Sequence, residues 1–189
     1  MFDFPVLVID LEATCSDDGA IDELSMETIE IGACFVNGDG IVLGSFQSFV
    51  RPIQNPELTN FCVQLTGIRQ ENVDSAPSFA IAADLLAQFV GRHKTSETIW
   101  FSWGKYDLKQ IARDSIRHGI PNPIELPHQN AKRLFAKAQR IGKEVGMSRA
   151  CQMVGLEIEG AHHRALDDAL NIARLLPWVH GDKFIKRAG

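Results

Sequence analysis

Two acidic residues, Asp10 and Glu12, stand at the end of a short apolar run near the N-terminus. A buried strand is predicted for this run, PVLVIDL (5–11), because it is rich in β-branched residues. Side chains two positions apart on a strand project from the same face. Burial and mutual repulsion disfavour such a pair, and a divalent cation such as Mg²⁺ or Mn²⁺ relieves both. Taken alone, the pair fits equally well a loop cap beside a solvated acid.

A third acid, Asp107, comes soon after the segment TIWFS (98–102), which predicts another strand. If this strand runs parallel to the first, Asp107 lies at the sheet edge where Asp10 and Glu12 also lie. Ligands gather at such edges in open α/β sheets. Asp107 would also start a helix, so its alternative role is that of an N-cap.

Two further candidate acids lie in the string GAHHRALDD (160–168), at the start of a predicted helix. Asp168 falls in the first turns of that helix and His163 at or just before its start, so both can approach one site. The adjacent Asp167 leaves the choice of acid open on spacing alone. His162 is interpreted as a surface or hydrogen-bonded histidine.

The remaining pattern predicts the elements that must position these groups. Second and third strands are expected at 28–37 and 41–50, joined by the turn NGDG (37–40). Three antiparallel strands, a helix and then a strand parallel to the first give an α/β domain with a mixed sheet, which is the outline of a ribonuclease-H-like fold. A length of 189 residues predicts one domain over 1–189. The expected helices are 77–90, 107–118, 131–143, 148–154 and 164–178.

The charge balance limits the kinds of partner that the chain can bind. A net charge of −5 and a sequence pI near 5.7 argue against a long electrostatic footprint on duplex DNA. They do not argue against an enzyme that holds a few nucleotides through bound cations. Basic residues gather between 130 and 149, where the commoner interpretation is a solvated helix face and the functional one is a guide for upstream phosphates. These residues are Lys132, Arg133, Lys137, Arg140, Lys143 and Arg149.

The N-terminus and the cysteines predict a cytoplasmic protein. The apolar run is cut by Asp10 and Glu12 and follows no basic segment, so neither a secretory signal nor a membrane span is expected. The four cysteines show no zinc-ligand spacing and are interpreted as reduced, packed thiols.

Five strings spread over nearly the whole chain resemble the DEDD-family exonucleases of the histidine subtype, and among them the Eri-type exoribonucleases. The strings are VIDLEATC (8–15), IEIGA (29–33), RPIQNPELTNFCVQLTGI (51–68), WGKYD (103–107) and HHRALDDALNIARL (162–175). In the family motif the metal-binding acid lies five residues after the histidine. The resemblance therefore pairs His163 with Asp168 and leaves Asp167 as a neighbour. Arg164 stands where another subtype has tyrosine.

The resemblance implies 3′→5′ hydrolysis of single-stranded nucleic acid by two Mg²⁺ ions, with Mn²⁺ able to substitute. It implies that Asp10 bridges the ions, that Glu12 and Asp168 complete one site, and that Asp107 serves the other. His163 would take the proton of the attacking water, and nucleoside 5′-monophosphates would be released. The expected substrate is the 3′ end of RNA. A DNA-directed exonuclease and a non-catalytic nucleic-acid-binding module are the alternatives.

The resemblance also implies contacts with the terminal nucleotide. Phe61 and Tyr106 resemble base-stacking aromatics, although Tyr106 stands where close relatives have tryptophan, and core packing is the alternative for both. Because the chain starts almost at the first strand, we expect no accessory nucleic-acid-binding region, and we expect no obligate protein partner. The other implied contacts are Ala13, Thr14, Leu65 and Thr66.

Overall fold

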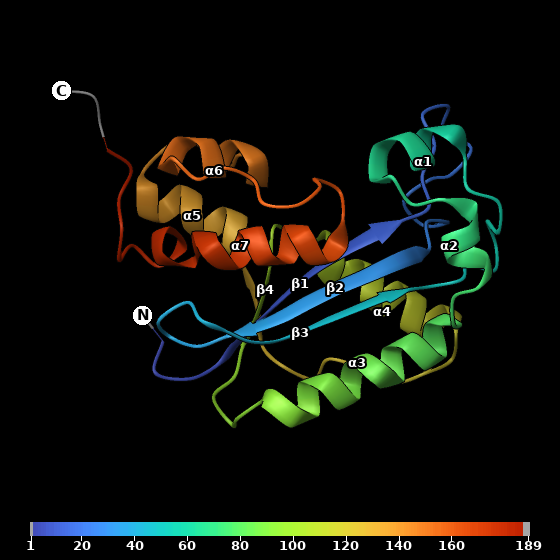
Figure 1. Cartoon of the computed structure of the whole chain (residues 1–189), viewed down its shortest axis with the longest axis horizontal. Coiled ribbons are helices and arrows are strands. Elements are labelled where there is room, and N and C mark those ends of the chain that lie inside the picture. The colour runs from blue at the N-terminus through green and yellow to red at the C-terminus, as the bar shows by residue number, and fades with distance from the viewer. Residues whose placement is uncertain (1, 187–189) are drawn as a thin grey trace.

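The computed structural model describes residues 2–186 of the chain, which build a five-stranded mixed sheet between two groups of helices (Figure 1). The strand order is β3-β2-β1-β4-β5. The strands are β1 (Val6–Ala13), β2 (Thr28–Val36), β3 (Val42–Phe49), β4 (Trp100–Ser102) and β5 (His128–Asn130). The helices are α1 (Asn60–Thr66), α2 (Gln70–Asp74), α3 (Phe79–His93), α4 (Tyr106–Arg117), α5 (Ala131–Gln139), α6 (Met147–Val154) and α7 (Ala165–Val179).

The strand directions place three strand ends at one edge of the sheet. β1 pairs antiparallel with β2, and β2 pairs antiparallel with β3. β4 and β5 run parallel to β1, so the carboxyl ends of these three strands share an edge. The predicted α/β class and the order of antiparallel and then parallel strands are both confirmed.

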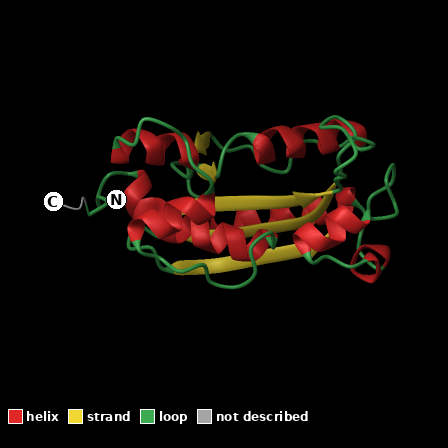
Figure 2. Cartoon of the chain, turned by 90° about the horizontal axis from the view of Figure 1, so that it is seen from above, coloured by secondary structure: helices red, strands yellow, loops and turns green. Residues whose placement is uncertain are grey.

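The two faces of the sheet bury two separate apolar clusters. Val6 and Val8 on β1 pack toward α5, α6 and α7, whereas Leu7 and Ile9 pack toward α3 and α4. Because helices cover both faces, β1 is apolar on both sides, as a buried strand is expected to be. In Figure 1 α5, α6 and α7 lie above the sheet and α3 lies below it, and Figure 2 shows α7 lying over the strands.

Element boundaries differ from the prediction in a few places. β1 extends to Ala13, so Asp10 and Glu12 lie inside the strand near its end. The predicted helix 131–143 stops at Gln139, because Arg140 adopts a left-handed conformation and caps the helix. The prediction did not include α1, α2 and β5. These elements have 7, 5 and 3 residues, too few for apolar periodicity to reveal.

Two further observations concern the membrane and the thiols. Within residues 2–186, no helix combines the length and the apolar character that crossing a membrane requires. All four cysteines are free thiols, and Cys34, Cys62 and Cys151 are buried.

Candidate active site

Three carboxylates meet near the end of β1, on the face that α7 covers. Val8, Asp10 and Glu12 are every second residue of β1, so their side chains project from the same face of the sheet. Asp168 lies in the first turn of α7. Oxygen atoms of these three carboxylates lie within 4.8 Å of one another. Residues 158 positions apart in the sequence are therefore brought into one acidic cluster by the packing of α7 on the sheet.

Gly32 on β2 lets α7 approach this closely. Gly32 is the register partner of Asp10 in the β1–β2 pair. A Cβ atom at this position would lie 2.1 Å from the backbone carbonyl carbon of Ala165, at the start of α7. A larger residue would therefore move the start of the helix, and Asp168 with it, away from β1.

Asp107 joins the cluster through the backbone of β1. Its Oδ1 accepts a hydrogen bond from the amide of Leu11, the residue between Asp10 and Glu12, at 3.1 Å. Asp107 is buried in the first turn of α4, and the cap position of that helix is Lys105. The N-cap alternative for Asp107 is thus not what the structure shows. Its carboxylate instead holds α4 against the acidic end of β1.

Burial and like charge together disfavour ionisation of this cluster. Burial, followed by the charge of Asp107, raises the pKa of Asp10 well above its ordinary value. Burial, followed by the charge of Asp168, raises the pKa of Glu12 to about 8, and burial raises that of Asp107 to about 6. A set of hard oxygen donors that repel one another is the ligand set that Mg²⁺ or Mn²⁺ prefers, so the residues fit a divalent-metal centre.

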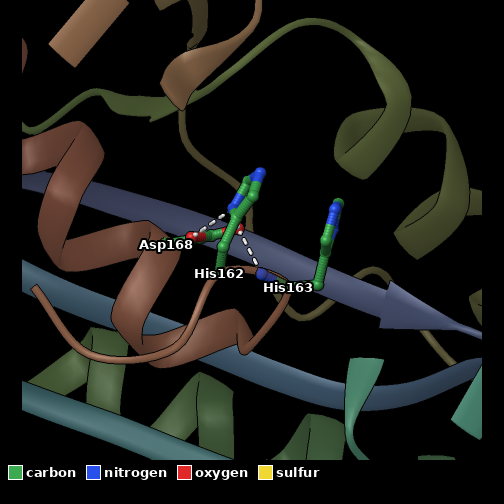
Figure 3. A group of neighbouring side chains, drawn as sticks. All are labelled: His162, His163 and Asp168. Carbon is green, nitrogen blue, oxygen red and sulfur yellow. Dashed lines mark hydrogen bonds and ion pairs between the residues drawn. The ribbon is translucent and has the colours of Figure 1, made fainter. Parts of the chain in front are cut away.

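Two stacked histidines border the cluster at the start of α7 (Figure 3). The backbone amide of His163 donates to Oδ2 of Asp168 at 3.1 Å, and His163 has a left-handed φ of 64°. The ring of His162 lies 4.0 Å from that of His163, and its Nδ1 lies 3.0 Å from Oδ2 of Asp168. Burial, followed by the neighbouring His162, lowers the pKa of His163, which favours the neutral imidazole.

The structure separates the two adjacent acids of α7. Asp168 turns toward Asp10 and Glu12, whereas Oδ2 of Asp167 accepts a hydrogen bond from the amide of Ala161 at 2.8 Å. Asp167 therefore ties down the loop that precedes the helix. His162, interpreted from the sequence as a surface or hydrogen-bonded histidine, is 43% exposed and bonds to the clustered acid Asp168.

Helix α1 is fastened to the end of β1 and presents two of the predicted contact residues. The hydroxyl of Thr59 caps α1 by accepting from the amide of Cys62 at 3.0 Å, and it donates to the carbonyl of Cys15 at 2.6 Å. Phe61 is half-buried and Leu65 is exposed on this helix. Both side chains are therefore accessible to a ligand.

Three other predicted contact residues have internal partners. The hydroxyl of Thr66 donates to the carbonyl of Cys62 at 2.8 Å, and that of Thr14 accepts from the amide of Glu27 at 3.0 Å. Both threonines are buried, and so is Ala13. In this structure they support α1 and the loop after β1, and their contact with substrate stays a prediction.

Tyr106 begins α4 directly before Asp107 and is partly exposed. Its hydroxyl donates to the sulfur of Met26 at 3.5 Å, and the guanidinium of Arg113 lies 5.9 Å from the ring centroid. The ring is thus held on the surface near the cluster, which suits either a stacking platform or a packed aromatic.

Sequence reasoning missed a buried acid next to the cluster, Glu30 on β2. Glu30 is the register partner of Glu12 and forms an ion pair with Arg164. The available signal was its place in the string IEIGA, where a single acid interrupts an apolar strand. An uncompensated charge is expensive in a buried strand, so this position called for a partner.

The basic stretch is divided between elements. Lys132 and Arg133 lie in the first turn of α5, which begins directly after β5 at the sheet edge that holds the acidic cluster. Lys137 is in the last turn of α5, and Arg149 lies on α6. The beginning of the stretch therefore shares an edge with the site.

Comparison with known proteins places this geometry in a family. Residues 7–176 match the exonuclease family RNase_T. The human protein "ERI1 exoribonuclease 2" is 31% identical over 94% of this chain, and the fission yeast "3'-5' exonuclease eri1" (Schizosaccharomyces pombe) is 27% identical over 90%. This chain spans 28% of the length of the human protein and 66% of the yeast one.

The fold is also that of a solved exonuclease domain. The nuclease domain of 3'hExo, a DEDDh family member bound to rAMP, superposes with a TM-score of 0.80 at 22% identity, over 93% of this chain and 90% of that one. The family match extends from β1 to α7, the two elements that supply the clustered acids. The chain belongs to the RNase_T family of exonucleases.

Proposed function

We propose that this chain is a metal-dependent 3′→5′ exonuclease that shortens single-stranded nucleic acid, RNA in preference to DNA. The observation that carries the proposal is the convergence of Asp10, Glu12 and Asp168 within 4.8 Å, with Asp107 bonded to the strand between the first two. Divalent-metal catalysis is what the DEDDh family implies. The repelling carboxylates give a physical reason for it in this chain.

The four acids have separate tasks in this proposal. Asp10, the central acid, would contact both of two Mg²⁺ ions, Glu12 and Asp168 would complete the site of one, and Asp107 would serve the other. Bound ions supply activation of the attacking water and stabilisation of the leaving 3′ oxygen. The protein contributes a fixed arrangement, because Gly32 sets the approach of α7 and the Leu11 amide sets that of Asp107.

His163 is the proposed general base. Its lowered pKa keeps the imidazole neutral near pH 7, so that it can accept a proton. The bond from its backbone amide to Asp168 keeps the residue at the edge of the cluster. The side chain is only partly buried, which leaves room for it to turn toward a substrate.

The proposed substrate path uses the exposed groups around the cluster. Phe61 and Leu65 on α1, together with Tyr106 on α4, would hold the terminal nucleotide. Lys132 and Arg133 would meet phosphates upstream. Two relatives support the preference for RNA. The human relative is named as an exoribonuclease, and the superposed nuclease domain of 3'hExo is bound to rAMP, a ribonucleotide.

Product analysis on matched strands tests this function. RNA and DNA oligonucleotides of one sequence, each 5′-labelled, are incubated with the protein in Mg²⁺ or in EDTA, next to a circular version of each. We expect a ladder of products shortened from the 3′ end, made faster from RNA, with nucleoside 5′-monophosphates released and circles left intact. Cleavage of circles, or activity that persists in EDTA, would refute the proposal, and faster loss of DNA would refute the preference for RNA.

A further inference from the structure

Glu30 is a further carboxylate, fully buried, on the face of the sheet that carries Asp10 and Glu12. Glu30 on β2 is the register partner of Glu12 on β1, and it has no exposed surface. Its charge contributes to the raised pKa values of Asp10 and Glu12. The roles proposed above for Asp10, Glu12, Asp107 and Asp168 do not use it.

The partners of Glu30 come from the start of α7. Nε of Arg164 donates to Oε2 of Glu30 at 3.1 Å, and Nη2 donates to Oε1 at 2.9 Å, which makes a bidentate pair. The backbone amide of Ala165, the first residue of the helix, donates to Oε2 at 3.1 Å. Two further groups enclose the pair, because Gln47 on β3 donates to Oε1 and the Arg164 guanidinium lies 5.3 Å from the ring centroid of Phe49.

These contacts fix the backbone that carries two members of the active site. Arg164 directly follows His163, and its carbonyl accepts the amide of Asp168 at 2.9 Å in the first turn of α7. The helix start cannot move closer, because Gly32 already meets the backbone of Ala165. It cannot move away without breaking the Glu30 bonds. The two contacts therefore set the distance between Asp168 and β1 from opposite sides.

The pair also balances charge. Five acids, Asp10, Glu12, Glu30, Asp107 and Asp168, lie together at this end of the sheet, and Arg164 is the cation bonded to one of them. Its charge cancels that of Glu30. Four carboxylates are then left, and their summed charge matches that of two divalent ions.

We infer that Glu30 and Arg164 are a positioning pair, which holds the start of α7 so that Asp168 faces Asp10 and Glu12 and His163 lies beside Asp168. This inference rests on the proposed function. Loss of a partner that orients a metal ligand typically lowers metal affinity or activity by 10–100-fold. We expect Glu30→Gln and Arg164→Gln to lower kcat on a single-stranded oligonucleotide by at least about tenfold. KM should change less than about threefold, because the bonds of the pair join β2 and β3 to the start of α7 and involve neither Phe61, Leu65 nor Tyr106.

Arg174→Gln is the matched control. Arg174 lies further along the same helix, its side chain is 29% exposed against 31% for Arg164, and it pairs with Glu159 at 3.0 Å. The Arg174→Gln variant should keep the native kcat, and a lower stability is the only change expected of it. Mn²⁺ binding by calorimetry, without substrate, gives a second readout, which we expect to weaken about tenfold in Glu30→Gln and Arg164→Gln but not in Arg174→Gln.

Several outcomes would overturn the inference. If Glu30→Gln and Arg164→Gln only lower the melting temperature, as a structural ion pair would, the positioning role is wrong. If Arg164→Gln binds Mn²⁺ more tightly than the native chain, Glu30 is itself a ligand that Arg164 blocks. If the native chain binds Mn²⁺ but shows no nuclease activity, the proposed function fails, and the calorimetric comparison still decides the positioning role. If the native chain neither binds Mn²⁺ nor cleaves, both fail.

Discussion

Two buried acidic regions of this molecule treat their carboxylates in opposite ways. On α4, Asp114 is 1% exposed, and its Oδ2 accepts from the amide and hydroxyl of Thr28, at 3.0 and 2.6 Å, and from Gln110 at 2.9 Å. Its Oδ1 is paired with Arg117. Within residues 2–186, by contrast, no donor forms a hydrogen bond with the carboxylate of Asp10 or of Glu12.

The difference separates an acid that stabilises the fold from acids kept for a ligand. A buried carboxylate with a full set of donors makes the native state rigid and specific. Buried carboxylates that face one another without donors destabilise the protein, and groups perturbed in this way gather at functional sites. The contrast predicts that mutations in the two regions change stability with opposite signs and change activity very unequally.

The largest expected effect is that of Asp10→Asn. Loss of the central acid should lower kcat by roughly 10³-fold, the scale of losing a group that acts directly on the transition state. In metal-free protein at pH 8 the same change should raise the melting temperature, because it removes a repelled carboxyl. Steady-state cleavage and thermal melting in EDTA measure the two effects. A melting temperature that falls would break the contrast.

Asp114→Asn should show the reverse pattern. Removing one partner of a buried ion pair costs about 3 kcal/mol of unfolding free energy, because Arg117 is left uncompensated. The folded fraction should keep its kcat to within a few-fold. Urea unfolding followed beside cleavage at a temperature where the variant is folded makes the comparison. Abolished cleavage by well-folded Asp114→Asn would contradict the assignment of this region to the fold.

His163→Ala should lower kcat by about 10²-fold, within the range expected for loss of a general base. The neighbouring histidine supplies the control. His162→Ala removes an imidazole that stacks on the ring of His163 and bonds to Asp168. We expect a loss below about tenfold from His162→Ala. Equal losses from the two variants would mean that the histidines act only through Asp168.

The smallest effect concerns pH in the metal-free protein. The pKa of Glu12 is about 8 in the folded chain against an ordinary value of 4.5, so between these values the folded state binds more protons than the unfolded state. Glu12 therefore does not reduce the stability of the folded state below pH 4.5, and it reduces that stability progressively as the pH rises toward 8. Melting in EDTA should therefore show Glu12→Gln gaining on the native chain between pH 6 and 8, and saturating Mg²⁺ should reverse the order. A constant difference across this range would contradict the shift.

The fold and most of the acidic cluster could be predicted from the sequence, because both depend on local sequence patterns. Apolar runs predicted β1 and β2, and periodicity predicted α3, α4 and α7. Two acids on one strand face already implied that Asp10 and Glu12 lie together. Resemblance was needed to choose Asp168 over Asp167, since both lie in the first turn of α7.

What the sequence could not reveal depends on contacts across the chain. The pairing of Glu30 with Arg164 joins residues 134 positions apart, and no local pattern encodes that separation. The bond between Asp107 and the Leu11 amide is similarly remote, at 96 positions. α1 was overlooked because it is short, although Thr59 before it and Gly67 after it are the residues that cap such a helix.

One comparison tests the central claim most directly. The release of nucleoside 5′-monophosphate from single-stranded RNA in Mg²⁺ is measured for Asp168→Asn and for Asp167→Asn, its neighbour on the same helix turn. Asp168 lies within the carboxylate cluster, whereas Asp167 bonds to the amide of Ala161. We predict that Asp168→Asn loses most of the native rate of release while remaining folded, and that Asp167→Asn retains most of it. Equal release by the two variants, or loss in Asp167→Asn alone, would contradict the site.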